Sequence, residues 1–138
     1  MNYWIIGFTP ETYTVVKKRS MIGVRKDVWK RFSEEMHIGD KFIGYISKLV
    51  LFDSFGTIQS DATFEEDFAF HPEKWYPGRR KVILEKVGLA VQARELFLGI
   101  QPFNEINTVP GNYIMCKGGF VKISEKDFKW LYGRIESK

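Results

Sequence analysis

The sequence predicts a single α+β domain, residues 1–138, in which a curved mixed sheet or small barrel carries helices near both ends. Several short segments are rich in β-branched residues and are separated by glycine or charged residues, as strands are. Two longer segments instead place apolar residues at helical spacing. The strand-like segments do not alternate regularly with helices, which argues against repeated β-α-β units.

The first third of the chain is expected to contain a strand and one or two helices. Residues 3–8 are short, aromatic and β-branched, which indicates a buried strand. Residues 11–19 are either a short helix or an irregular crossing, because threonine and valine are weak helix formers. Residues 20–25 are expected to be a loop that leads into a helix over 26–37. The apolar stripe of this helix repeats at every fourth position, at Val28, Phe32 and Met36.

Short strands are expected to fill most of the rest. A turn at Gly39-Asp40 precedes a strand over 41–47. One helical turn is expected over residues 95–99, and a polar loop is expected over residues 104–112. Further strands are predicted over 49–52, 56–60, 82–87, 89–93 and 119–123.

The last segment predicts a capped amphipathic helix. The Ser124 hydroxyl can accept a hydrogen bond from a free backbone N–H, and acidic residues in the first turn oppose the positive end of the helix. The expected apolar face consists of Phe128, Leu131, Tyr132 and Ile135.

Composition indicates a soluble protein that folds without cross-links. Apolar residues make up 44% of the 138 residues and aromatic residues 16%, enough for one core. Cys116 is the only cysteine, so no internal disulfide can form. No apolar run approaches the ~20 residues that cross a bilayer, and residues 1–8 do not resemble a signal peptide. We therefore expect a cytoplasmic location and no membrane partner.

The net charge of +4 is distributed unevenly along the chain. Residues 1–52 contain nine basic and five acidic residues, and residues 74–138 contain twelve and six. Residues 53–73 between them contain six acidic residues and no Lys or Arg. Clustered cations attract phosphates, so nucleic acid is a reasonable partner, although a basic isoelectric point alone is common.

No catalytic, metal or cofactor motif is apparent. His37 and His71 lie far apart in sequence, and no phosphate-binding glycine motif occurs. Cys116 is expected to be buried and inert, although a nucleophilic role with a histidine stays open. The acidic run 65–67 is expected to be solvated, with cation binding or acid-base catalysis as the alternative. Residues 117–119 favour a plain turn over an anion cradle.

Residues 68–81 combine aromatic and basic side chains. Proline and glycine interrupt this segment and prevent a continuous helix. Aromatic rings at a loop rim can sandwich an unstacked base while nearby cations bind its phosphates. Alternatively, the rings close one end of the barrel. The residues concerned are Phe68, Phe70, Trp75 and Tyr76 with Lys74, Arg79, Arg80 and Lys81.

An ordered series of motifs resembles the EVE domain family of small archaeal and bacterial proteins. The series consists of Trp4, Gly23-Val24-Arg25, Gly39-Asp40 and Tyr45-x-Ser47, and the resemblance continues weakly to the C-terminus. Residues 70–75 also look like a stretch of the related YTH domains. The sequence departs from the EVE pattern at Met21, Lys26, Gly44 and Ile46, where that pattern has Trp, Asn, Phe and His.

The resemblance implies a PUA-like fold that binds RNA or DNA through one extruded base, such as a methylated base, in an aromatic pocket. No metal or other cofactor is implied. Two alternatives stay open: a nucleic-acid-processing enzyme that uses Cys116 or the acidic run, and a small-molecule or protein-interaction module. The implied base-pocket residues are Met21, Gly23, Val24, Arg25, Lys26, Ser47, Phe70 and Trp75. The implied phosphate-binding residues are Arg79, Arg80 and Lys81.

Overall fold

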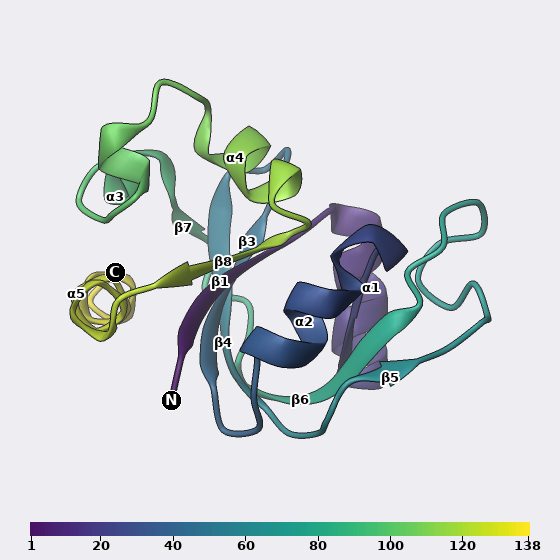
Figure 1. Ribbon diagram of the computed structural model, residues 1–138. Coiled ribbons are helices and arrows are strands. Elements are labelled where there is room, and N and C mark those ends of the chain that lie inside the picture. The colour runs from purple at the N-terminus through teal and green to yellow at the C-terminus, as the bar shows by residue number, and fades with distance from the viewer.

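One curled, mixed sheet organises the chain, which a computed structural model describes over residues 1–138 (Figure 1). Its eight strands are β1 (Tyr3–Phe8), β2 (Met21–Val24), β3 (Lys41–Ile46), β4 (Leu51–Ile58), β5 (Thr63–Phe64), β6 (Gly78–Lys86), β7 (Val91–Gln92) and β8 (Phe120–Ile123). The α-helices are α1 (Pro10–Arg19), α2 (Trp29–Glu35), α3 (Arg94–Phe97), α4 (Pro110–Cys116) and α5 (Glu125–Glu136). Two 3-10 turns, Lys26–Val28 and Phe103–Glu105, precede α2 and α4.

The strand order is β2-β6-β4-β3-β1-β8, with β5 added to β6 and β7 added to β4. Only β1 and β3 run parallel, with Tyr3 opposite Lys41 and Phe8 opposite Ile46. All other pairs are antiparallel. The sheet curls into a half-barrel, with α1 and α2 on one side and α3 and α5 on the other (Figure 1). This confirms the predicted α+β class with a curved sheet flanked by helices.

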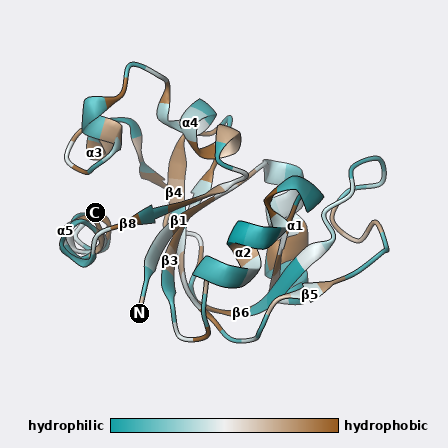
Figure 2. Cartoon of the chain, viewed as in Figure 1, coloured by the Kyte–Doolittle hydropathy of each residue, from teal (hydrophilic) through white to brown (hydrophobic).

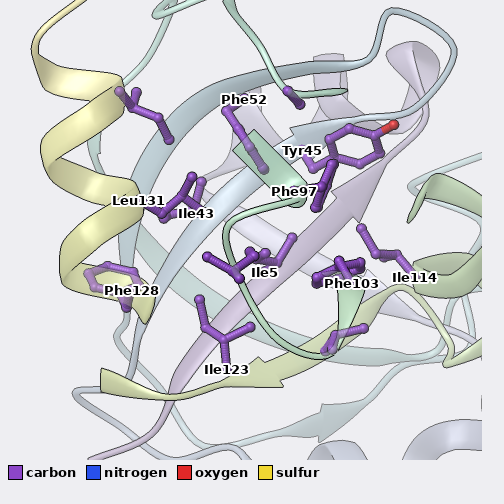
Figure 3. Close-up of a cluster of buried hydrophobic side chains, with 14 of the residues drawn as sticks. Ile5, Ile43, Tyr45, Phe52, Phe97, Phe103, Ile114, Ile123, Phe128 and Leu131 are labelled. Atoms are coloured by element: carbon purple, nitrogen blue, oxygen red, sulfur yellow. The ribbon is translucent and has the colours of Figure 1, made fainter. Parts of the chain in front are cut away.

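Each face of the sheet carries its own apolar core. Alternate residues of β1 point to opposite faces, so Trp4 and Ile6 pack beside α1 and α2 while Ile5 packs beside α5. Phe128 and Leu131 of α5 point toward Ile5 and Ile43 (Figure 3). Covering both faces explains why the central strands are apolar along most of their length (Figure 2).

A buried carboxylate explains the Gly-Asp turn. Gly39 adopts a φ of 92°, which favours glycine, and places Asp40 inside the molecule. The Asp40 carboxylate accepts hydrogen bonds from the backbone N–H of Asn2, the indole Nε1 of Trp4 and the backbone N–H of His37, each at 2.9 Å. It therefore joins β1 to the connection between α2 and β3.

Several elements differ from the sequence predictions. Residues 21–24, expected to be a loop, form β2, because Ile22 and Val24 alternate into the core and the strand pairs with β6. The helix predicted over 26–37 begins as a 3-10 turn and its α-helical part ends at Glu35. Residues 49–52 and 56–60 contribute to one strand, β4. The predicted polar loop 104–112 contains the start of α4, where Pro110 occupies the first turn. None of the helices is long and apolar enough to cross a membrane.

Candidate functional site

A pocket of about 60 Å³ opens at one end of the half-barrel. Its walls come from the end of β1, the first turns of α1, the end of β2 with Arg25, the loop before β6, and the turn between α4 and β8. Half of the lining residues are hydrophobic, and Arg25 is the only charged residue among them. The pocket is therefore an apolar recess with one cation and no carboxylate in its wall.

Gly23 and Phe70 form the tightest part of the wall. A Cβ atom added at Gly23 would lie 2.9 Å from two carbons of the Phe70 ring, closer than side chains normally approach. Phe70 is only 4% exposed, and the Arg79 guanidinium lies 5.3 Å from the centre of its ring. Glycine at position 23 thus lets the aromatic ring lie directly against the β2 backbone.

The N-terminus of α1 forms another side of the pocket through Thr9 and Thr12. The Thr9 hydroxyl accepts from the Thr12 backbone N–H at 3.2 Å, and the Thr12 hydroxyl accepts from the Thr9 backbone N–H at 3.1 Å. This reciprocal cap fixes where the helix begins. The positive end of the α1 dipole consequently lies beside the pocket, where negative charge is favoured.

Gly118 and Gly119 close the pocket from the side of β8, with φ angles of 87° and 96°. Their N–H groups donate to the carbonyls of Met115 and Ile114, at 3.1 and 3.0 Å. Because both donors are used to end α4, this segment is a helix-terminating turn and does not offer its amides to an anion. A Cβ at Gly118 would lie 2.5 Å from Cγ1 of Val28, so the turn also packs tightly against the start of the α2 region.

Two of the three residues expected to bind phosphate are buried. Arg79 and Arg80 are each 3% exposed. Arg79 pairs with the Asp67 carboxylate at 2.7 Å, and this contact lowers the pKa of Asp67. Arg80 donates to the carbonyls of Phe32, Ser33, Met36 and Ser60, and burial lowers its pKa. Both arginines hold the fold together, so the prediction that they bind phosphate is corrected; Lys81 alone of the three is exposed.

The other four predicted pocket residues lie outside the pocket wall. Trp75 donates from Nε1 to the Glu65 carbonyl at 3.1 Å and packs edge-on against Phe64. The Ser47 hydroxyl donates to the Phe8 carbonyl at 3.2 Å. Met21 pairs with Lys81 in the β2–β6 ladder. Lys26 is exposed and follows Arg25, which forms an ion pair of 3.2 Å with Asp27.

The structure therefore brings four of the eight predicted pocket residues together in the pocket wall, namely Gly23, Val24, Arg25 and Phe70. It adds two further aromatic wall residues, Phe8 and Tyr76, of which Tyr76 lies one position after the predicted Trp75. The aromatic and basic composition of residues 68–81 already indicated that Tyr76 was a candidate. The contributions of Thr9, Thr12 and Met115 had no signal in the sequence.

Catalytic groups do not gather around the pocket. The His71 Nδ1 atom accepts from the backbone N–H groups of Glu73 and Lys74, at 3.0 and 3.2 Å, and so shapes its own loop. Cys116 is exposed, contrary to the expectation that it is buried. No three His, Cys, Asp or Glu side chains lie together as metal ligands would.

Solved structures share this fold. The YTH domain of Zygosaccharomyces rouxii MRB1, in complex with N6-methyladenosine RNA, has a TM-score of 0.73 and 16% identity, covering 99% of this chain and 85% of that one. The Pho92 YTH domain, in complex with m6A, has a TM-score of 0.74 and 15% identity, covering 99% and 87%. A hypothetical protein from Leishmania major has a TM-score of 0.69 and 13% identity, covering 99% and 96%.

These similarities establish the fold, a PUA-like half-barrel of the kind seen in YTH domains. No protein-family model matches the chain, and no curated protein matches it. Its likeness to the EVE family therefore remains a resemblance of motifs.

Proposed function

We propose that this chain, as a member of the EVE family, binds RNA or DNA and holds one unstacked base in the pocket beside Gly23. The observation that carries the proposal is the composition of the pocket wall. Three aromatic residues, Phe8, Phe70 and Tyr76, line a largely apolar recess whose single charged residue is Arg25. Base rings stack on aromatic side chains, and a cation at the edge suits the phosphate attached to the base.

The location of the pocket also favours a phosphate ligand. The positive end of α1 lies beside it, and Arg25 and Lys26 are exposed where β2 ends. In the proposed complex, Arg25 contacts the phosphate of the extruded nucleotide. Lys26 and Lys81 contact neighbouring phosphates, and Met21 supports the β2 edge of the site. No acidic side chain lines the pocket, so no negative charge in the wall repels a phosphate.

A whole base requires the pocket to widen. Its volume of about 60 Å³ is smaller than a cavity of about 150 Å³, which accommodates benzene. Phe70 and Tyr76 are wall residues that can yield, because both belong to the loop between β5 and β6 and not to a strand; Phe70 is the one that lies against Gly23. In the proposal the ring swings away from Gly23 and then stacks on the bound base.

The structural neighbours suggest which base to test first. Two of them are described as complexes with N6-methyladenosine or m6A. The apolar wall of the pocket favours a methylated base, because a methyl group loses nothing by leaving water. We propose binding without catalysis, in a reducing compartment such as the cytoplasm, where the exposed Cys116 thiol stays reduced.

The test is fluorescence anisotropy with labelled single-stranded RNA and DNA, each with one adenine or one N6-methyladenine. Phe70→Ala should weaken binding more than tenfold, because stacking contributes roughly 1–3 kcal/mol per base. Phe68→Ala is the matched control: Phe68 lies in the same loop, is 51% exposed and does not line the pocket, so affinity should change less than twofold. Circular dichroism checks that both variants are folded. If the two folded variants had equal affinities, Phe70 would not be a residue that contacts the bound base.

Two further measurements separate the alternative functions. Affinity should fall as salt concentration rises, because phosphate contacts release counterions. An affinity that does not depend on salt concentration would instead indicate a small-molecule or protein ligand. Oligonucleotides recovered after incubation, with and without Mg²⁺, should be unchanged; cleaved or altered strands would indicate an enzyme.

A further inference from the structure

The hairpin between β3 and β4 touches two elements that form the pocket. Its tip consists of Ser47, Lys48, Leu49 and Val50. The Ser47 backbone N–H and hydroxyl both donate to the carbonyl of Phe8, a pocket residue, at 2.8 and 3.2 Å. The Lys48 ammonium lies 3.9 Å from the carboxylate of Glu11, in the first turn of α1. The tip is therefore fixed beside the pocket and is not a distant loop.

The backbone of this tip has an unusual conformation. Lys48 and Val50 have φ angles of 65° and 54°, in the left-handed region that a β-branched residue such as valine rarely occupies. Strained backbone of this kind persists only where neighbouring structure enforces it. Three hydrogen bonds do so here: Leu49 N–H to the Ser47 carbonyl at 2.6 Å, Val50 N–H to the Ile46 carbonyl at 3.0 Å, and Ala93 N–H to the Val50 carbonyl at 3.1 Å.

The consequence of this conformation is an outward-facing leucine between anchored neighbours. Val50 packs against the core, whereas Leu49 is 56% exposed and Lys48 is exposed beside it. Hairpin tips normally carry polar residues or glycine. A tip held in shape by strain and hydrogen bonds, with an apolar side chain facing solvent, is suited to insertion into another molecule.

We propose that the nucleic acid bound is double-stranded and that Leu49 inserts into the duplex where the extruded base was stacked. This inference rests on the base pocket proposed above and specifies its substrate. Removing a base from a duplex leaves an unstacked gap, and apolar side chains such as leucine enter base steps as wedges. Lys48, the neighbour of Leu49, contacts the adjoining phosphates. The pocket and the wedge act on the same base pair from two sides.

The test compares a 20-base-pair duplex that carries one central N6-methyladenine with the labelled single strand alone. RNA and DNA versions are both measured. Leu49→Ala should weaken duplex binding at least tenfold and change single-strand binding less than twofold, because a single strand has no gap to fill. Leu98→Ala is the matched control, since Leu98 is also exposed, at 69%, but belongs to the end of α3. It should leave both affinities unchanged.

A second readout follows the base step directly. With 2-aminopurine beside the target base, the wild-type protein should increase fluorescence as the base leaves the stack, and Leu49→Ala should not. If the wild type binds the single strand but not the duplex, or if Leu49→Ala equals wild type on the duplex, the wedge is refuted while the pocket stands. If the wild-type protein bound neither the single strand nor the duplex, the pocket itself would be refuted.

Discussion

Replacing Arg80 by methionine should destabilise the fold strongly, because its guanidinium satisfies four backbone carbonyls. Three of these, from Phe32, Ser33 and Met36, belong to the end of α2, at distances of 2.9, 3.3 and 2.5 Å; the fourth belongs to Ser60, at 3.0 Å. A hydrogen bond from a charged donor contributes about 1.5–3 kcal/mol, and an acceptor that stays buried without a partner costs about 1–3 kcal/mol.

Removing the buried charge offsets part of this loss, since methionine needs no solvation and fills most of the same volume. We therefore expect Arg80→Met to lower the free energy of unfolding by about 3 kcal/mol. This value is smaller than the summed contribution of the lost hydrogen bonds, because the variant no longer has to bury a charge. Urea denaturation, followed by tryptophan fluorescence, measures the change.

Lys81→Met is the matched control, because it removes the neighbouring exposed cation. It should change stability by less than about 0.5 kcal/mol and weaken nucleic-acid binding instead. If Arg80→Met changed stability by less than about 1 kcal/mol and reduced binding in its place, Arg80 would be a phosphate ligand, and the reasoning from its burial would be refuted.

The remaining predictions concern the loop and turn around the pocket. The Arg79 contact lowers the pKa of the Asp67 carboxyl below its ordinary value, so this contact stabilises the folded loop above about pH 4 and should be lost as pH falls through the folded pKa. Trp75 fluorescence should report that transition, and Asp67→Asn should abolish it. Gly118→Ala should lower the free energy of unfolding by about 2 kcal/mol, because it combines a φ of 87° with a contact of 2.5 Å to Val28. Gly133→Ala, in α5 with open space around it, should raise the free energy of unfolding by about 0.5–1 kcal/mol. Urea denaturation measures both glycine variants, and equal changes in stability for Gly118→Ala and Gly133→Ala would contradict the geometry described for the two positions.

The strands and the capped helix could be predicted from local patterns. The β-branched and aromatic composition of residues 3–8 was enough to predict the strand β1. The Ser124 hydroxyl accepts from the Asp127 backbone N–H, as the predicted helix cap requires. The strand β2 was missed because four residues around Gly23 carry little pattern of their own. Its conformation depends on pairing with β6, a contact across more than fifty residues of sequence.

The pocket was only partly predictable, for a related reason. The motif resemblance identified Gly23, Val24, Arg25 and Phe70, which the fold brings together. The direction of each side chain depends on tertiary contacts, so Trp75 turned to the Glu65 carbonyl while its neighbour Tyr76 lines the pocket. Arg79 and Arg80 looked like surface cations because sequence does not reveal which carbonyls need a donor.

The most direct test of the central claim is an amide NMR titration with an oligonucleotide that contains a single N6-methyladenine. The backbone amides of Gly23, Arg25 and Gly119 should shift together with one dissociation constant, and the Phe70 ring signals should move with them. Amides around Trp130, on the opposite side of the sheet, should stay unchanged. Saturable shifts confined to α5, with none around Gly23, would contradict the claim that a base enters this pocket.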